Sequence, residues 1–217
     1  MEVVKPIIFL HIPKCGGTSI SSWLKSASIH GYKFIPYYPI YQHQKKVLHI
    51  KNSEKTIVSG HFLRHQGNSF DDTFSGEAEL ITLLRDPFDV LVSFFHWSVR
   101  NGFTWTNETN VKEFMSYVMT GSGFNYFRNP LYDALPRKRE GETVQQFCNR
   151  FSVIGTIDNL DAFKVRVESL IGHTMPEIKH LNKSSKSSLD PNLRPMLRKK
   201  LPDEYELFDY VSSISCY

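Results

Sequence analysis

The densest group of residues that could do chemistry lies near the start of the chain. In "PKCGGTS" (13–19), a lysine, a glycine pair and two hydroxyl side chains follow one another: Lys14, Gly16, Gly17, Thr18 and Ser19. A glycine pair between a strand and a helix lets backbone N–H groups turn toward an anion, and the helix N-terminus adds partial positive charge. The segment therefore predicts a binding site for a phosphate or sulfate group. A tight turn that carries a surface lysine is the alternative.

A second cation lies at the end of a later apolar segment. "ELITLLRDP" (79–87) predicts a strand that Pro87 ends, with Arg85 at its carboxyl end. In an open α/β sheet, ligands lie outside the carboxyl ends of the strands, so we expect Arg85 to face the same ligand as Lys14. The planar guanidinium of arginine suits a phosphate group. Two such cations predict a ligand with two separated phosphate-like groups.

The elements that must position these residues alternate along the chain. Short apolar runs predict buried strands over 6–12, 55–61, 79–87 and 152–158. Amphipathic spacing predicts helices over 18–28, 88–100, 111–119, 142–151, 159–172, 190–201 and 203–211. The alternation predicts an α/β fold, a three-layer sandwich with a central, mostly parallel sheet. We expect one domain over residues 1–217, in which 101–141 forms an insertion or a flexible lid.

Composition narrows the class of protein. The chain has 217 residues and a net charge of +4, which suits an anionic ligand without indicating nucleic acid. Its three cysteines, Cys15, Cys148 and Cys216, form no CxxC pair, so neither a disulfide framework nor a zinc ribbon is indicated. The N-terminal apolar run is too short to span a bilayer. We therefore expect a soluble, cytoplasmic protein without a membrane span, whose partner is a small molecule or a glycan.

The loop differs from the nucleotide-binding loop of ATPases. Lys14 precedes the glycine pair, so the pattern GxxxxGK[ST] and its Mg²⁺-binding hydroxyl are absent from the sequence. Asp86 precedes a proline, where capping of the next helix is the expected role. Phosphoryl transfer from a triphosphate normally needs a divalent ion, so we expect no metal and a donor with less charge on the transferred group. Cys15 is expected to be a neutral loop residue, because a cysteine phosphatase would need an arginine at the position of Ser21.

Two motifs together resemble those of a known enzyme family. "HIPKCGGTSI" (11–20) is similar to the 5′-phosphosulfate loop of the sulfotransferases that use 3′-phosphoadenosine 5′-phosphosulfate (PAPS). "LLRDPFDVLVSFF" (83–95) is similar to their 3′-phosphate motif. With "SGH" (59–61) between the motifs, their order is most similar to that in the carbohydrate sulfotransferases related to the heparan and uronyl enzymes. The resemblance implies a P-loop-like sulfotransferase fold with PAPS as the donor co-substrate.

The resemblance also implies roles for single residues. Those implied in donor binding are Lys14, Cys15, Gly16, Gly17, Thr18 and Ser19 at the 5′-phosphosulfate, Arg85 and Ser93 at the 3′-phosphate, and Asn182, Lys183 and Ser184 in a loop that closes over the nucleotide. An ordinary solvated connection is the alternative for that last loop. The chain departs from the family pattern at three positions: Cys15 replaces a threonine, Asp89 a second arginine and Phe95 a tyrosine.

Lys14 and one histidine are the candidate catalytic residues. Sulfuryl transfer to a hydroxyl group needs a base for the acceptor proton and positive charge at the leaving phosphate. Lys14 can stabilise the bridging oxygen, and His61 is the candidate base because it follows a predicted strand and a glycine at the expected ligand crevice. Packing or capping is the alternative role for His61. His11 is expected to be structural, and a metal shared by His61 and His65 is disfavoured because the sequence shows no third ligand beside them.

The sequence thus predicts a sulfotransferase that moves a sulfuryl group from PAPS to a hydroxyl group of a glycan or another small hydroxylated acceptor, with a histidine base and no metal. A nucleotide kinase is the enzymatic alternative, disfavoured by the missing Walker lysine and metal carboxylate. A nucleotide- or glycan-binding module without catalysis is the alternative from another class. Variable loops set specificity in such folds, so the motifs leave the acceptor and the oligomeric state open.

Overall fold

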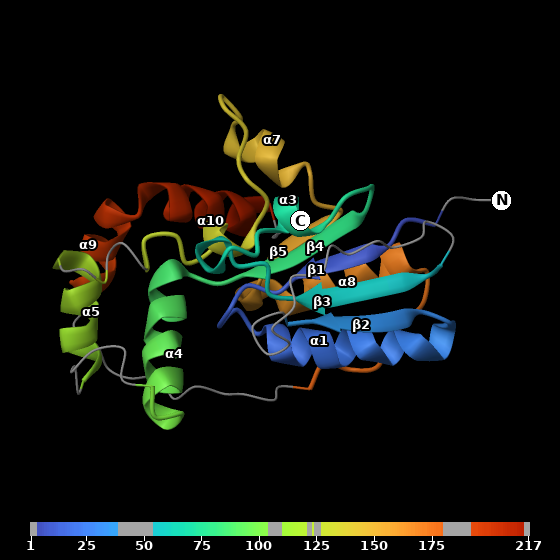
Figure 1. Cartoon of the computed structure of the whole chain (residues 1–217), viewed down its shortest axis with the longest axis horizontal. Helices are drawn as coiled ribbons and strands as arrows, with labels where there is room; N and C mark the ends of the chain where they lie inside the picture. Colours follow the sequence, from blue (N-terminus) through green and yellow to red (C-terminus); the bar gives the residue numbers. More distant parts are fainter. Residues whose placement is uncertain are drawn as a thin grey trace.

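The computed structural model describes residues 4–38, 54–103, 110–120, 123, 127–179 and 192–214. Its five strands form one sheet in the order β2-β3-β1-β4-β5 (Figure 1). The strands are β1 (Ile7–Leu10), β2 (Lys33–Tyr37), β3 (Thr56–Gly60), β4 (Glu79–Leu84) and β5 (Val153–Thr156). Every neighbouring pair is parallel, so the predicted parallel sheet is confirmed.

Strand β1 lies at the centre of the sheet because its side chains are apolar on both faces. All of its residues are at most 2% exposed, as expected for a parallel strand covered by helices on both sides. Ile7 and Phe9 belong to the apolar cluster on one face, and Ile8 and Leu10 to the cluster on the other. Strand β1 therefore contributes side chains to the apolar core on both faces of the sheet.

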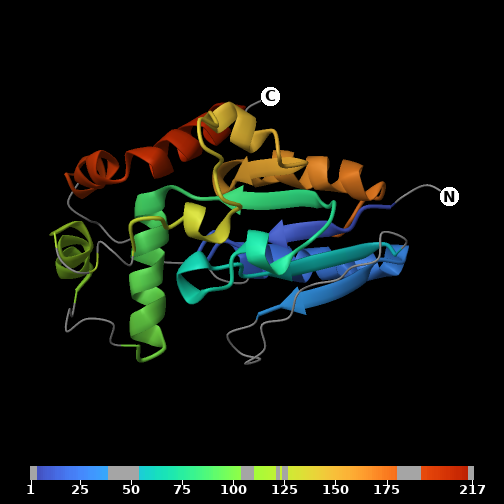
Figure 2. The same ribbon diagram turned by 45° about the horizontal axis from the view of Figure 1, so that its top comes forward.

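Helices cover both faces of the sheet (Figure 2). One layer holds α1 (Gly17–Lys25) and α8 (Leu160–Ile171), which pack on the cluster that contains Ile7 and Phe9. The other layer holds α7 (Val144–Cys148) and α10 (Pro202–Ile214). The predicted α/β fold with three layers is confirmed.

Three strands end at the same edge of the sheet. Leu10 of β1 lies opposite Gly60 of β3 and Thr82 of β4, and the hydroxyl of Thr82 donates a 2.9 Å hydrogen bond to the carbonyl oxygen of Leu10. The loop after β1 begins at this edge, as do His61 and Arg85. The register thus brings together the segments that the sequence singled out.

Helix α4 (Pro87–Arg100) starts from this edge and extends beyond the sheet (Figure 1). Asp86 caps it, because one oxygen of its carboxylate accepts a 2.8 Å hydrogen bond from the backbone N–H of Phe88. Pro87 at the first helical position needs no hydrogen-bond partner for its nitrogen. The predicted capping role of Asp86 is confirmed.

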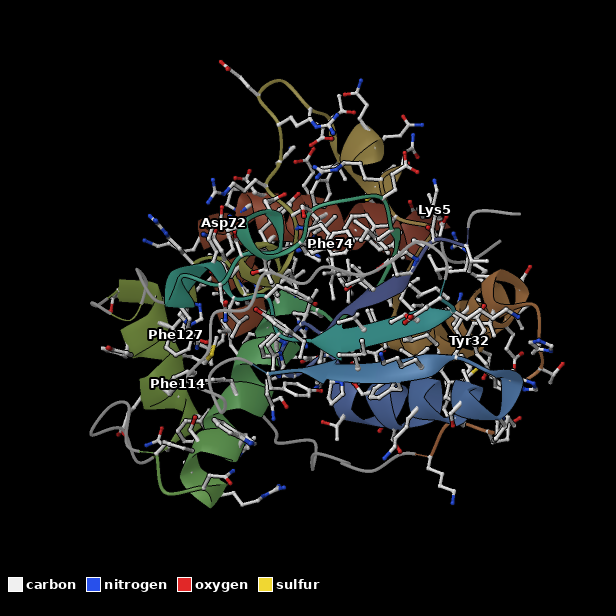
Figure 3. All side chains as sticks on the ribbon, turned by 45° about the vertical axis from the view of Figure 1, so that its right-hand side comes forward. Lys5, Tyr32, Asp72, Phe74, Phe114 and Phe127 are labelled. Atoms are coloured by element: carbon white, nitrogen blue, oxygen red, sulfur yellow. The ribbon has the colours of Figure 1, made fainter. Side chains whose placement is uncertain are left out.

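A third apolar cluster joins α4 to α5 (Val111–Thr120) and α9 (Leu193–Lys200). Phe114 of α5 and Phe127 lie side by side there, as Figure 3 shows, with ring centroids 5.4 Å apart in an edge-to-face arrangement. This cluster fixes α4 beside the carboxyl ends of the strands.

Strand β2 was not among the predicted strands. Pro36 lies within it, and a proline cannot donate a hydrogen bond to a neighbouring strand. The sheet tolerates this because β2 is an end strand, paired with β3. The proline therefore made the local sequence unlike a strand, although pairing with β3 stabilises one there.

The predicted insertion or lid over 101–141 is described in part. Helix α5 and the short 3₁₀ helix η3 (Tyr132–Ala134) both lie in it. Leu131 and Leu135, which flank η3, are 0% exposed, so this part of the segment belongs to the core. Among the residues that the structure describes, no helix is long and apolar enough to cross a membrane.

Candidate functional site

The loop after β1 has a backbone conformation that exposes its N–H groups. Lys14 and Gly16 have φ angles of 67° and 76°, in the left-handed region. For a residue with a side chain this conformation is strained, and such strain is common at functional sites. Gly16 is the N-cap of α1 and has no side-chain cap of its own. The N–H groups of Gly17 and Thr18 at the start of α1 therefore lie at the mouth of the loop, where they suit an anion.

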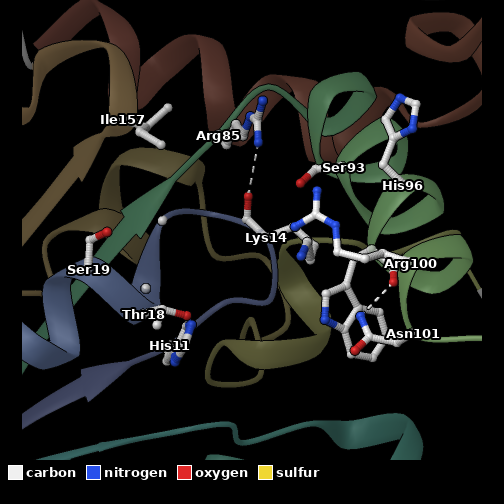
Figure 4. Close-up of a pocket in the computed structure, with 13 residues that line it drawn as sticks. His11, Lys14, Thr18, Ser19, Arg85, Ser93, His96, Arg100, Asn101 and Ile157 are labelled. Carbon is white, nitrogen blue, oxygen red and sulfur yellow. Dashed lines mark hydrogen bonds between the residues drawn. The ribbon is translucent and has the colours of Figure 1, made fainter. Parts of the chain in front are cut away.

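Arg85 lies against this loop. Its Nη1 donates a 3.3 Å hydrogen bond to the main-chain oxygen of Lys14 (Figure 4). The carboxyl end of β4 thus brings its guanidinium to the residue that carries the loop ammonium. The two predicted anchors belong to one site.

The loop, β4 and α4 enclose a cavity of about 350 Å³, which we call the cationic cavity. Of the residues predicted to bind the donor, it is lined by Lys14, Gly16, Gly17, Thr18, Ser19, Arg85 and Ser93. It is also lined by His11, His96, Trp97, Arg100, Asn101 and Ile157, which the sequence analysis did not assign to donor binding. The cavity therefore gathers both predicted anion sites and adds a third cation.

Two of the added residues, Trp97 and Arg100, lie on the same face of α4 as Ser93. Trp97 and Arg100 follow Ser93 by four and seven positions, which is the spacing of a single helical face. Figure 4 shows the guanidinium of Arg100 turned toward Lys14 and Ser93. Because the sequence places Ser93 on a helix, this spacing could have predicted that Trp97 and Arg100 also line the donor site.

Electrostatics at Lys14 favour an anion in the cationic cavity. Burial, and after it the charges of Arg100 and Arg85, together lower the pKa of Lys14 from 10.5 to about 8. The ammonium lies 5.4 Å from the centre of the Trp97 ring. A bound anion would offset both the desolvation and the repulsion among the three cations.

Cys15 differs from its neighbours in the loop. Its side chain is 1% exposed and belongs to the apolar cluster beneath the sheet. Burial raises the pKa of its thiol to about 12, so the thiol is protonated at neutral pH. Cys15 can contribute its backbone to the loop, and its sulfur is no nucleophile.

Asp89, which stands where the resembled motif has a second arginine, points to α9. Its carboxylate accepts a 2.7 Å hydrogen bond from Arg194, whose other nitrogen lies 2.5 Å from Asp86. The ring of Phe88 lies under the same guanidinium, at 4.7 Å. Arg194 therefore neutralises Asp89 and ties α9 to the start of α4, away from the cationic cavity.

Two histidines lie at the ends of β1 and β3. Nδ1 of His61 donates a 2.7 Å hydrogen bond to the main-chain oxygen of His11, because that oxygen can only accept. The two rings are 4.1 Å apart. Burial lowers the pKa of both, and the charge of Lys14 acts in the same direction, so both rings are neutral at physiological pH. The ring of His11 lies against Gly17, where an added Cβ would be 1.8 Å from it.

The two histidines take different places relative to the cavities from those that their predicted roles suggest. His11, expected to be structural, is 6% exposed and lines the cationic cavity. His61, the candidate base, lies behind it and is among the lining residues of neither cavity described here. His65 does not pair with His61. Its Nδ1 lies within hydrogen-bonding distance of the carboxylate of Asp133, which also accepts a 2.9 Å hydrogen bond from the backbone N–H of His65.

A second cavity, of about 100 Å³, also has Lys14 in its lining. We call it the apolar cavity. Its lining is Pro13, Leu63, Val90, Leu91, Phe94, Phe127 and Pro130, together with Lys14, His65, Gln66, Asn129 and Asp133. Lys14 is shared by both cavities. Sequence reasoning missed this cavity because its walls come from four separate segments.

The predicted nucleotide loop with Asn182, Lys183 and Ser184 lies outside the described residues. Its role in binding stays a prediction. Within the described ranges, no three His, Cys, Asp or Glu side chains are grouped as a metal site would need.

Comparison with known proteins finds a matching family and similar solved structures. The family described as "Sulfotransferase domain" matches residues 3–153. The structure is similar to that of a sulfotransferase from Alicyclobacillus acidocaldarius, with a TM-score of 0.56, 14% sequence identity and 95% of each chain covered. At that identity the likeness is one of fold. It is also similar to the mouse sulfotransferase SULT7A1 in complex with PAP, with a TM-score of 0.46 and 12% identity over 94% of this chain and 67% of that one. A search of curated proteins found no match.

Proposed function

We propose, because the chain belongs to the sulfotransferase domain family, that it transfers a sulfuryl group from PAPS to a hydroxyl group of a glycan or another small hydroxylated molecule. The observation that carries the proposal is the meeting of Lys14 and Arg85 in one cavity at the N-terminus of α1. PAPS has an anionic group at each end of its ribose. The cationic cavity offers a cation for each.

The residues present fit such a donor. Gly17, Thr18 and Ser19 at the N-terminus of α1 form one side of the cavity and suit the 5′-phosphosulfate. Ser93 and Arg100 lie on the α4 side and suit the 3′-phosphate. Arg100 supplies there a positive charge that the resembled motif takes from the arginine that Asp89 replaces. The volume of about 350 Å³ is within the range of small-molecule sites, roughly 300–1,000 Å³.

Lys14 is the residue proposed to stabilise the leaving group. Its ammonium lies over the ring of Trp97 in the lining of the cationic cavity, where it can stabilise the negative charge on the oxygen that departs with the phosphate. A partly desolvated ammonium stabilises that charge more strongly than one in water. Under this proposal Lys14, Arg85 and Arg100 supply the positive charge, and no divalent ion takes part.

His61 remains the base that the sequence predicts. The hydrogen bond from its Nδ1 to His11 leaves Nε2 as the acceptor, which is the tautomer a general base needs. Its ring lies 4.1 Å from that of His11, which lines the cationic cavity.

The donor part of the proposal is tested by thermal unfolding with three ligands. We expect 3′-phosphoadenosine 5′-phosphate (PAP) to raise the melting temperature without metal, and ATP with Mg²⁺ to raise it less. At about 100 times the dissociation constant a ligand adds about 2.7 kcal/mol, which is about 5–10 °C for a chain of this size. A larger shift with ATP and Mg²⁺ would favour the kinase alternative.

Transfer itself is tested with PAPS that carries ³⁵S and a broad panel of hydroxylated acceptors. We expect label in at least one acceptor. Binding of PAP with no transfer to any hydroxyl group would favour the non-catalytic module. A protein that neither binds PAP nor transfers label would contradict the proposed function altogether.

A further inference from the structure

One buried imidazole lines the cationic cavity. His11 is 6% exposed and belongs to the lining of that cavity. Its Nδ1 lies 3.4 Å from the hydroxyl oxygen of Tyr38, whereas its Nε2 has no hydrogen-bond partner among the residues that the structure describes. Since buried polar groups are normally hydrogen-bonded, a nitrogen of this kind in the wall of a cavity points to a bound ligand.

The backbone and the ring of His11 are both held in place. The backbone N–H donates a 2.9 Å hydrogen bond to the carbonyl oxygen of Gly60, and the carbonyl oxygen accepts one of 2.7 Å from His61. The ring stacks on that of Phe9 at 5.7 Å and meets the ring of Tyr38 edge-on at 6.2 Å. A ring fixed in this way loses little further freedom when a ligand binds to it.

One edge of the ring faces the start of α1. A Cβ added to Gly17 would lie 1.8 Å from Cδ2 and 2.0 Å from Nε2 of His11, so this edge touches the first residue of the helix. Figure 4 draws His11 with the other residues that line the cavity at this helix N-terminus. Nε2 is therefore on the side of the ring where the loop suits an anion.

The ring of His11 is neutral at physiological pH, so one nitrogen carries a hydrogen and the other a lone pair. Burial lowers its pKa well below 6.5, and the charges of His61 and Lys14 act in the same direction. The hydroxyl of Tyr38 has a hydrogen to donate, and a lone pair on Nδ1 can accept it. That pairing places the ring hydrogen on Nε2.

We propose that His11 binds the 5′-phosphate of the donor through the N–H at Nε2, and that Tyr38 is the positioning residue that fixes this tautomer. This inference rests on the proposed function. It adds a donor-binding residue that precedes the loop, and it gives His11 a role in place of the structural one that the sequence predicts.

A neutral donor suits this place better than a further cation. Burial, and after it the charges of Arg100 and Arg85, already lower the pKa of Lys14. Another positive charge beside Lys14 would add to that repulsion, whereas the N–H of a neutral ring does not. Its hydrogen bond to an ionised phosphate oxygen is nevertheless stronger than one between two neutral groups. His11 therefore adds affinity for the anion at no electrostatic cost to Lys14.

The contact is tested with two ligands that differ at the 5′ position. PAP carries the 5′-phosphate, and adenosine 3′-phosphate lacks it. A hydrogen bond to a charged group corresponds to a change in affinity of roughly 10- to 150-fold, so His11→Asn should raise the Kd for PAP by that factor and the Kd for adenosine 3′-phosphate by less than about threefold. The amide nitrogen of glutamine can reach the place of Nε2, but that of asparagine reaches only the place of Nδ1. His11→Gln should therefore recover most of the affinity in calorimetric titration.

Tyr38→Phe tests the positioning role without a change in the cavity lining. The variant keeps the ring and loses the hydroxyl, so it should raise the Kd for PAP about 2- to 12-fold, the effect of one hydrogen bond between neutral groups. Tyr32→Phe is the matched control. Tyr32 lies at the other end of β2, and its hydroxyl donates a 3.3 Å hydrogen bond to the carbonyl oxygen of Ile171. This variant should leave the Kd for PAP unchanged.

The tautomer is measured directly by NMR. In protein labelled with ¹⁵N-histidine, long-range ¹H–¹⁵N correlations show which ring nitrogen carries the hydrogen, and the signals missing from His11→Gln identify His11. We expect the hydrogen on Nε2 in wild type and a larger share of it on Nδ1 in Tyr38→Phe. A wild-type ring with its hydrogen on Nδ1 would overturn the inference, even if the variants at position 11 fold poorly.

The outcomes keep the two proposals apart. If wild type binds PAP and His11→Asn binds it as tightly, the proposed function stands and this inference is wrong. If His11→Asn weakens both ligands by one factor, or if His11→Gln loses as much PAP affinity as His11→Asn, the ring is structural and the inference is again wrong. A wild type that neither binds PAP nor transfers sulfate overturns both proposals. A loss confined to PAP, with recovery in His11→Gln, supports the inference.

Discussion

The guanidinium of Arg85 donates a hydrogen bond of 3.3 Å to the main-chain oxygen of Lys14. Lys14 has a left-handed backbone, with φ of 67°, which an amino acid with a side chain adopts only when its surroundings hold it there. Arg85 therefore has two roles in the same site. It stabilises the strained loop through one nitrogen and has further N–H groups for an anion.

This double role predicts an unusually large effect of Arg85→Ala. A hydrogen bond to a charged group contributes about 1.5–3 kcal/mol, so the Kd for PAP should rise by roughly 10- to 150-fold even before the loop relaxes. Arg85→Lys should restore charge but not both contacts, and should recover only part of the affinity. Calorimetric titration of PAP measures each value.

The matched control is Arg137→Ala. Arg137 forms a surface ion pair with Asp72 in which both side chains are 58% exposed, and such pairs contribute little. Its substitution should leave the Kd for PAP unchanged. An equal loss of affinity in both variants would mean that Arg85 acts only through overall charge.

The pKa of Lys14 predicts how donor binding depends on pH. In the free protein burial lowers this pKa to about 8, so the ammonium is charged below pH 8 and loses its proton above it. An anionic ligand binds the charged form and raises its pKa. The affinity for PAP should therefore be highest near pH 7 and should fall above pH 8, by up to about tenfold per pH unit.

Lys14→Arg separates this effect from other titrations. Arginine keeps its charge throughout this pH range, so the variant should bind PAP with an affinity that is nearly constant between pH 7 and 9.5. Titration at fixed ionic strength over that range compares the two proteins. A decline of the same slope in the variant would assign the pH dependence to another group.

The close packing of Gly17 against the ring of His11 predicts that no larger residue fits at position 17. A Cβ on residue 17 would lie 1.8 Å from the ring of His11, and the ring of His61 packs 4.1 Å from that of His11 and limits its movement. Gly17→Ala should therefore displace the start of α1, lower stability by about 1–3 kcal/mol and abolish the thermal shift caused by PAP. Differential scanning fluorimetry with and without PAP measures both effects.

Gly141→Ala is the control for that prediction. Gly141 has φ of 71°, and a Cβ added there would meet no atom within 4 Å. The only destabilisation expected from alanine is therefore that of a left-handed backbone in a residue with a side chain. This variant should lose some stability and keep the full PAP shift. In the double variant Gly17→Ala/His11→Ala, removal of the ring should recover part of the lost stability. Independent, additive losses would contradict a clash between the two residues.

The sequence could predict the residues that follow strand ends. Lys14 and Arg85 each lie just after a short apolar run, and the parallel register carries such positions to one edge of the sheet. Trp97 and Arg100 were within reach of helical spacing from Ser93. Each of these residues lies next to a predicted strand end or on a predicted helix, so a short stretch of sequence is enough to indicate its place.

The contact between His65 and Asp133 could not be predicted in the same way. Asp133 meets His65 across 68 positions, and no periodicity links η3 to the segment after β3. Leu131 and Tyr132, which lead to Asp133, are held through their backbone N–H groups by a carboxylate on α10. Such contacts depend on the packing of whole layers, which motif spacing does not encode.

The carboxylate that holds this segment is Glu204, and its burial makes stability depend on pH. Glu204 is 1% exposed and accepts hydrogen bonds of 2.7 Å and 3.3 Å from the N–H groups of Leu131 and Tyr132. Burial raises its pKa from 4.5 to about 8, although these bonds act in the opposite direction. Between those pH values the folded protein keeps a proton that the unfolded chain has lost. The contribution of Glu204 to stability is therefore complete below about pH 4.5 and falls as pH rises toward 8.

Glu204→Gln should remove this pH dependence. The Gln amide nitrogen cannot accept a backbone N–H, so the variant should be less stable by about 1–3 kcal/mol at pH 5. Since Gln does not titrate, that difference should shrink as pH rises to 8, by at most about 1.4 kcal/mol per pH unit. Urea unfolding of both proteins at pH 5, 6.5 and 8 measures the trend. Glu206→Gln, an exposed position on the same helix, should give a small and constant difference. A gap that stays nearly constant from pH 5 to 8 would mean that Glu204 is already ionised in the folded protein at pH 5, and that the two N–H groups stabilise its carboxylate.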